Sequence, residues 1–219
     1  ENPACPICVE DIDEAHLVCV THGHSDHLGN AIEIVKRTGA TLVTIPEVAA
    51  YCSRHGIPYD DGGGTVHVGG SVRLRDVTVR AVYALHSSDI MGQEYLERNE
   101  LQPGSGACGM ILEPDGGVGV YFDGDTGIFG DMQLIGRLYR PGVAVLPIGG
   151  KYTMGVREAA YAVELLDCDV LIPGHYNTFP SQRADTDDLA RQVAVRRPGT
   201  EVVVLEPGGS YTLLMEGRD

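Results

Sequence analysis

Four side chains able to bind a metal ion occur within six residues of this sequence. His22, His24, Asp26 and His27 stand in the run HGHSDH, just after the apolar segment Leu17–Val20. Imidazoles and carboxylates hold the divalent ions of hydrolytic enzymes. In a tight loop at the end of a buried strand, such side chains can turn towards one cleft. The run therefore predicts a metal site, and a polar loop that binds nothing is the weaker alternative.

Three more candidate ligands stand where short apolar segments end. His86, Asp125 and His175 each follow a segment that is typical of a strand, and a glycine directly precedes both Asp125 and His175. Sites in α/β folds are assembled at the carboxyl ends of neighbouring strands. A single histidine after a strand is usually only a satisfied polar residue. Together with the HGHSDH run, however, the three predict one shared site.

The elements that must position these residues alternate between short strands and helices, which predicts a mixed α/β fold in one domain over residues 1–219. The period-two pattern of residues 65–85 predicts a β-meander, and residues 87–105 are expected to form a long loop that acts as a lid. Strands are also expected at 17–20, 41–45, 107–112, 118–122, 143–146, 170–172, 202–205 and 211–214, and helices at 31–37, 46–55, 131–139, 156–166 and 186–195.

The charge of the chain argues against several partners. It carries 16 Lys and Arg against 31 Asp and Glu, a net charge of −15. Such a surface repels nucleic-acid backbones and anionic membranes, so a small-molecule substrate is expected. No apolar run approaches the about 20 residues of a membrane helix, and no signal peptide is visible. A cytoplasmic location is expected.

The six cysteines do not suggest a disulfide framework. Cys5 and Cys8 form a CxxC pair without a second pair at zinc-finger spacing, so we expect a structural or incidental role for them. Cys19, Cys108 and Cys168 lie in or beside apolar segments and are expected to be small buried thiols. This usage fits a reducing compartment.

At this point a family resemblance becomes clear. The run THGHSDHLG at 21–29 resembles the THxHxDH signature of the metallo-β-lactamase superfamily. Four later segments resemble the branch labelled UPF0173 metal-dependent hydrolases, which is similar to the ascorbate-6-phosphate lactonase group: GDTG at 124–127, LPIGG at 146–150, YTMG at 152–155 and PGHYNTFP at 173–180. The resemblance extends from about residue 2 to residue 211, so it covers nearly the whole chain.

The resemblance implies a metallo-β-lactamase-like αββα sandwich and a ligand for each matching position. His22, His24 and His86 would hold one ion, Asp26, His27 and His175 a second, and Asp125 would bridge the two. A diiron redox branch of the superfamily usually carries Glu where this chain has His24, which favours a hydrolase. Two divalent ions are therefore expected, with Zn²⁺ the best fit and Mn, Fe, Co or Ni as alternatives.

The start of the sequence departs from the family pattern. Family members begin with a β-hairpin, and this sequence starts after that point, so the hairpin is expected to be missing. Its loss would expose strand edges and apolar faces, which favours association into a homo-oligomer.

The implied chemistry is hydrolysis by a metal-bound hydroxide of a small-molecule lactone, ester or phosphoester. Asp26 and Asp125 are the expected catalytic residues, with Asp26 orienting the nucleophile or accepting its proton. Lys151, Tyr152 and Thr153 are expected to bind substrate, together with Asn177. Lys151 could instead be a solvated loop residue, and Asn177 could only cap local backbone.

The sequence is also compatible with two other functions. The first is a phosphodiesterase or nuclease of the same superfamily, which the acidic surface disfavours for polymeric nucleic acid. The second is a metal-binding protein without catalysis. Metal content measured together with turnover would separate them.

Overall fold

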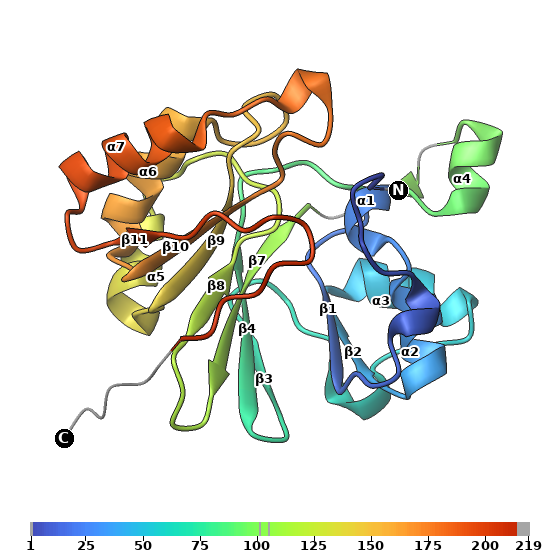
Figure 1. Cartoon of the computed structure of the whole chain (residues 1–219). Helices are drawn as coiled ribbons and strands as arrows, with labels where there is room; N and C mark the ends of the chain where they lie inside the picture. Colours follow the sequence, from blue (N-terminus) through green and yellow to red (C-terminus); the bar gives the residue numbers. More distant parts are fainter. Residues whose placement is uncertain (1, 101, 105, 214–219) are drawn as a thin grey trace.

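A mixed seven-stranded sheet forms the centre of the computed structural model, which describes residues 2–100, 102–104 and 106–213 (Figure 1). Its strand order is β11-β10-β9-β8-β7-β4-β3. The strands β8 to β11 run parallel, and β3, β4, β7 and β8 pair antiparallel. The bounds are Ser71–Leu74 (β3), Val77–Tyr83 (β4), Cys108–Pro114 (β7), Val120–Phe122 (β8), Val143–Pro147 (β9), Val170–Gly174 (β10) and Glu201–Val202 (β11).

Three amphipathic helices cover one face of this sheet, and their bounds are Met132–Tyr139 (α5), Val156–Leu166 (α6) and Thr186–Arg196 (α7). Their apolar stripes pack on side chains such as Ile111, Tyr121 and Leu146, which form one continuous core. The predicted and observed bounds of α6 are identical, and those of α5 and α7 differ by one residue at one end.

A small parallel sheet of Leu17–Val20 (β1) and Thr41–Thr44 (β2) packs against the other face, with the helices Ala31–Thr38 (α2) and Pro46–Arg54 (α3). The second core lies here. Val79 and Ala81 of β4 contribute to it, whereas Val82 turns to the first core, as the period-two alternation of a strand requires. Helices therefore flank two packed sheets, as expected.

The expected structureless loop 87–105 is instead a small unit of its own. It contains the short strands Asp89–Ile90 (β5) and Gln102–Pro103 (β6), with the helix Gln93–Arg98 (α4) between them. The side chain of Glu94 accepts a hydrogen bond from the Tyr51 hydroxyl (2.9 Å) and lies 3.1 Å from Nε2 of His55. These contacts fasten the unit to α3.

Two of the predicted strands are wrong. Residues 66–68 do not pair with β3, because Val66 N donates to Thr44 O and so docks this segment beside β2. At the C-terminal end, β11 ends at Val202 and residues 211–213 are not in a strand, while residue 214 lies outside the described part. Beyond β11, Val203 N continues the ladder with a hydrogen bond to Leu171 O (2.8 Å).

The cysteines are all unbridged. Cys108 and Cys168 are buried as expected, but Cys19 is exposed, since it lies on the outer side of β1. Cys5 and Cys8 are also exposed, and they bond locally to Ile7 O and to the Asp11 side chain rather than to each other. None of the helices in the described residues is long and apolar enough to cross a membrane.

Candidate metal centre

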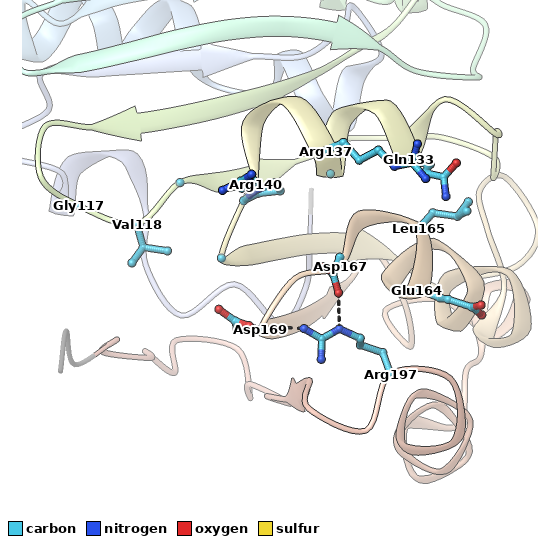
Figure 2. A pocket seen from close by; sticks show the side chains of 14 residues that line it. Gly117, Val118, Gln133, Arg137, Arg140, Glu164, Leu165, Asp167, Asp169 and Arg197 are labelled. Atoms are coloured by element: carbon cyan, nitrogen blue, oxygen red, sulfur yellow. Dashed lines mark hydrogen bonds and ion pairs between the residues drawn. The ribbon is translucent and has the colours of Figure 1, made fainter. Parts of the chain in front are cut away.

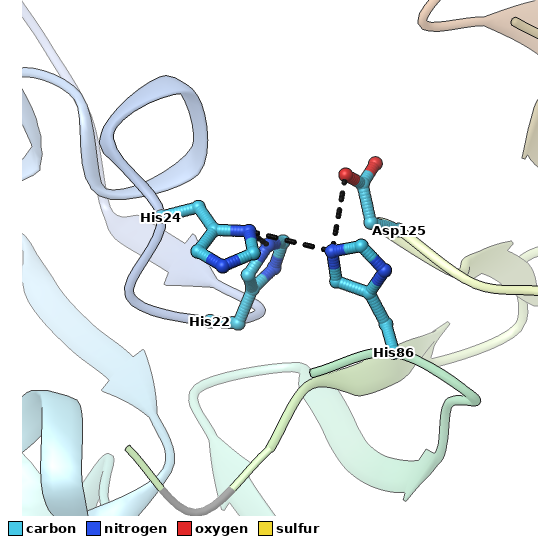
Figure 3. Close-up of side chains that lie close together, drawn as sticks. All are labelled: His22, His24, His86 and Asp125. Atoms are coloured by element: carbon cyan, nitrogen blue, oxygen red, sulfur yellow. Dashed lines mark hydrogen bonds and ion pairs between the residues drawn. The ribbon is translucent and has the colours of Figure 1, made fainter. Parts of the chain in front are cut away.

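Three imidazoles and one carboxylate converge at one end of the strands (Figure 3). We call His22, His24, His86 and Asp125 the inner cluster; one ligand atom from each lies within 4.8 Å of all the others. Nδ1 of His24 is 3.1 Å from Nε2 of His22 and 3.3 Å from Nε2 of His86. His22 is fully buried.

A second group shares one residue with the first. The outer cluster consists of Asp26, His27, Asp125 and His175, and its ligand atoms also lie within 4.8 Å of one another. Nε2 of His175 is 3.2 Å from Oδ2 of Asp26. The Asp26 side chain is 61% exposed, which opens this cluster to solvent.

The carboxylate of Asp125 faces both clusters, one oxygen to each. Oδ1 lies 3.2 Å from Nε2 of His27 and 3.5 Å from Nε2 of His175, whereas Oδ2 lies 3.6 Å from Nε2 of His86. The side chain is only 4% exposed. This geometry places one buried carboxylate between two sets of imidazoles.

The ligand nitrogens and oxygens of the two clusters are placed to bind cations rather than to hydrogen-bond with one another. Nε2 of His27 and Oδ1 of Asp125 are buried and close, yet neither has a hydrogen-bond partner among the described residues. A tetrahedral ion with bonds of about 2.0–2.1 Å separates its ligands by about 3.4 Å, close to the spacings seen here. The residues present therefore fit one divalent ion in each cluster.

Short, constrained segments position these side chains. β1 delivers His22, and the single-turn helix Ser25–Leu28 (α1) directs Asp26 and His27. Gly124 has a positive φ of 62°, and a Cβ there would lie 2.6 Å from Oγ1 of Thr21, so glycine allows the Asp125 loop to approach β1. His175 itself adopts the left-handed region (φ 54°), a strained conformation of the kind concentrated at functional sites.

The unit that contains β5, α4 and β6 also contacts the loop that carries His22 and His24. Met91 N donates to Gly23 O (2.7 Å), and Gly23 N donates to Oγ of Ser88 (3.2 Å). A Cβ on Gly23 would lie 2.8 Å from Asp89 O, so β5 packs directly on the residue between His22 and His24. Ser88 follows the ligand His86 by two residues, so the same segment supplies a ligand and this contact.

Two residues that support the imidazoles were not predicted. Oγ1 of Thr21 lies 3.1 Å from Nδ1 of His22 and 3.4 Å from Nδ1 of His27. Nε2 of Gln182, in the short helix Pro180–Gln182 (η3), lies 3.5 Å from Nδ1 of His175. Thr21 adjoins the first ligand and could have been suspected, whereas Gln182 reaches the site only through the fold of its loop.

Three polar residues that adjoin ligands in the sequence, Ser25, Asp123 and Thr126, make no hydrogen bond to an imidazole among the described residues. The hydroxyl of Thr126 bonds Leu85 N and Gly127 O, both backbone groups. Both oxygens of the buried Asp123 lack a hydrogen-bond partner among the described residues, and Ser25 makes no side-chain hydrogen bond to an imidazole there.

The two clusters have different electrostatics. Burial, followed by the neighbouring imidazoles of His27 and His24, lowers the pKa of His22 to about 3, so this ring is neutral and free to bind a cation at physiological pH. The hydrogen bond between His175 and Asp26 acts the other way at the outer cluster. It raises the pKa of His175 and holds that of Asp26 below its usual range.

The expected substrate residues occupy two loops beside the centre. The loop with Lys151, Tyr152 and Thr153 is tied to it, since Met154 N donates to Thr126 O and Ile148 N to Gly174 O. Lys151 and Tyr152 are exposed, with Nζ of Lys151 4.9 Å from the centre of the Tyr152 ring.

Thr153 and Asn177 make local contacts. The Thr153 hydroxyl bonds Met154 O (3.4 Å). Both amide atoms of Asn177 bond the backbone of Ala184, at 3.0 and 3.3 Å, which is the capping role left open by the sequence. Contact of either residue with substrate stays a prediction.

The remaining histidines lie outside both clusters. His16 pairs with Glu14 at 3.3 Å, His55 lies against Glu94, and His67 is exposed. The seven residues chosen from the sequence are therefore the ones that the structure brings together.

Comparison with known proteins gives a consistent family. The profile of the β-lactamase superfamily domain matches residues 1–176. A UPF0173 metal-dependent hydrolase of Methanopyrus kandleri is 44% identical over 96% of this chain and 87% of its own length, and one of Methanosarcina mazei is 42% identical over 97% and 87%. The solved structure of Igni18, a metallo hydrolase from Ignicoccus hospitalis, is 36% identical with a TM-score of 0.79, covering 95% of this chain and 84% of that one.

Proposed function

The chain belongs to the UPF0173 family of metal-dependent hydrolases in the β-lactamase superfamily, and on that premise we propose that it hydrolyses a small-molecule lactone, ester or phosphoester at a centre of two divalent ions. The observation that carries the proposal is the position of Asp125, whose two oxygens face different clusters. A bridging carboxylate of this kind is suited to holding two ions close together.

The proposed ligands are three imidazoles and Asp125 for the inner ion, and Asp26, His27, His175 and Asp125 for the outer ion. When bound, two such ions would supply Lewis-acid chemistry: they would lower the pKa of a water and polarise the bond under attack. Zn²⁺ fits this mixture of imidazole and carboxylate, and Mn, Fe, Co and Ni are alternatives.

Asp26 is the proposed proton acceptor. Its side chain is largely exposed at the mouth of the centre, while Oδ2 is engaged by Nε2 of His175. Oδ1 then remains to orient the attacking water and to take its proton. The hydrogen bond from His175 holds the pKa of this carboxyl group below its usual range, so the carboxylate stays ionised, as a general base requires.

Lys151 is the proposed anchor for a negatively charged part of the substrate. It is one of only two lysines in the chain, and its loop is hydrogen-bonded to residues next to Asp125 and His175. An ammonium group there would attract an anionic substrate towards an otherwise acidic molecule. The substrate class that follows is a small acidic lactone or phosphoester.

The test combines metal analysis with turnover. The chain is loaded separately with Zn²⁺ and Mn²⁺, bound metal per chain is measured, and chromogenic lactones, esters and phosphodiesters are assayed. We expect about two ions per chain and turnover of at least one class. Lys151→Met should raise KM for acidic members and leave the neutral members unchanged.

The control is His67→Ala, which removes an exposed imidazole outside both clusters and should retain metal and turnover. Two ions with no turnover of any class would instead support a metal-binding protein without catalysis. Turnover confined to phosphodiesters would favour the phosphodiesterase alternative.

A further inference from the structure

Gly23, the residue between the ligands His22 and His24, is hydrogen-bonded through both of its backbone groups to the unit of β5, α4 and β6. Its N–H donates to Oγ of Ser88 (3.2 Å), which directly precedes β5, and its carbonyl accepts from Met91 N (2.7 Å). The backbone that directs two imidazoles of the inner cluster is therefore held by this unit.

The side chain of Glu94 fastens the unit to the body of the molecule. Figure 1 shows α4, which carries Glu94, at the periphery. One carboxylate oxygen accepts from the Tyr51 hydroxyl (2.9 Å), and the other lies 3.1 Å from Nε2 of His55. We call these three side chains the clasp. Tyr51 is only 3% exposed and belongs to the second core, so the clasp is attached to a well-packed part of the protein.

The clasp lies close to the hydrogen bond between Met91 and Gly23. A Cβ at Gly92 would overlap the Tyr51 hydroxyl, so this hydroxyl lies directly against the backbone that follows Met91. Gly92 is also the N-cap of α4, and Glu94 lies in the first turn of that helix. The N–H group that bonds Gly23 and the carboxylate of the clasp are thus in one short segment.

The unit is tied together at both of its ends. β5 pairs antiparallel with β6, and Ile90 of β5 is buried in the second core. A Cβ at Gly104 would lie 2.5 Å from Ser88 O, so the two ends of the unit are in close contact. Loss of the clasp should therefore loosen the contacts to Gly23 as well as α4.

We propose that Glu94 is a positioning residue that holds the backbone between His22 and His24 in place through the clasp, and so slows the release of the inner ion. This role rests on the two-ion centre of the proposed function. Local opening of the unit frees the segment that carries two of the inner ligands. The outer ligands of α1 should be affected less, because the buried Leu28 anchors that helix in the second core.

Hydrogen exchange at the amides of Gly23 and Met91 tests this role, because both amides form hydrogen bonds between the unit and the ligand loop. In the metal-free full chain, Glu94→Ala should accelerate both about tenfold, since a hydrogen bond to a charged group no longer opposes opening. The amides of α5 should exchange as in the wild type. This measurement needs no bound ion, so its outcome does not depend on the two-ion centre.

Release of Zn²⁺ to a chelator is then followed in the loaded chain. One of two ions should leave about tenfold faster in Glu94→Ala, and the other should leave as in the wild type. Asp26→Ala, which is expected to hold the inner ion alone, identifies the faster one when it is combined with Glu94→Ala. Fewer than two ions in the wild type would contradict the proposed function, while the exchange result would still decide the role of Glu94.

A double-mutant cycle separates the clasp from general destabilisation. Tyr51→Phe removes only the hydroxyl and should accelerate exchange at Gly23 and Met91 less than Glu94→Ala does. It should add nothing in the Glu94→Ala chain, because both substitutions remove the same contact. Full additivity of the two effects would contradict a shared contact.

Glu164→Ala is the matched control. Glu164 lies 3.5 Å from Arg196 and lines a cavity where β8, β9 and β10 begin, at the edge of the large sheet opposite the metal centre (Figure 2). This variant should change neither the exchange at Gly23 nor the release of Zn²⁺. Unchanged exchange at Gly23 and Met91 in Glu94→Ala, or equal acceleration in α5, would overturn the proposal.

Discussion

The inner and outer clusters share Asp125 but differ in their other ligands and in their exposure. The inner cluster adds three imidazoles, including the fully buried His22, whereas the outer cluster adds two imidazoles and the largely exposed Asp26. The inner cluster is also enclosed by contacts from β5 to Gly23. This difference suggests a division of roles, in which the inner cluster anchors one ion firmly and the outer cluster meets substrate.

Among substitutions that distinguish the two clusters, the largest expected effect comes from removing a ligand that is unique to one of them. His24→Ala should abolish the inner ion and lower turnover about 10³-fold, since a catalytic cation contributes several kcal/mol to the transition state. Asp26→Ala should lose only the outer ion, with a similar loss of turnover. Metal analysis of each variant checks this, with His67→Ala as the control. Equal loss of both ions in the two variants would remove the distinction between the clusters.

A smaller effect is expected from the residues that orient the imidazoles. Thr21→Val removes the hydroxyl near His22 and His27, one ring from each cluster, and should weaken metal binding about 10–100-fold at both. Gln182→Leu should act on the outer ion alone, because His175 is the proposed ligand that the Gln182 amide faces. Competition with a chelator measures both affinities. An inner-ion loss in Gln182→Leu would contradict the assignment.

Lowering the pH should release the ions of the two clusters at different pH values, without any substitution. Protons compete with a cation below the pKa that a ligand has in the metal-free protein. Asp26 raises the pKa of His175, whereas burial and neighbouring imidazoles lower that of His22 to about 3. As pH falls, His175 should therefore protonate first, and the outer ion should leave at a higher pH than the inner. Bound metal measured between about pH 8 and pH 5 checks the order. Loss of the inner ion first would contradict the predicted difference between the two clusters.

The candidate ligands could be chosen from the sequence because each is tied to a local signal. His22 to His27 form a dense run, and His86, Asp125 and His175 follow strands whose apolar patterns are clear. The distance between Asp125 and the imidazoles could not be obtained in this way. It depends on the packing of Gly124 against Thr21, which joins residues far apart in the chain.

The elements that were missed depend on contacts between distant segments. Residues 66–68 alternate like a strand, yet Val66 bonds Thr44 in β2 instead of extending the meander. The unit from β5 to β6 has a weak local pattern and is held by Tyr51 and His55 through Glu94. Gln182 is brought to His175 by a turn within its own loop. The spacing of apolar residues along the sequence does not indicate any of these contacts.

The metal content of Asp125→Ala tests most directly whether Asp125 bridges two ions. The wild type should hold about two ions per chain. Asp125→Ala should hold neither ion firmly, because each cluster loses the oxygen that faces it. Asp115→Ala, which removes a carboxylate from the exposed β7–β8 turn, should keep both. Retention of both ions in Asp125→Ala would contradict the bridging role.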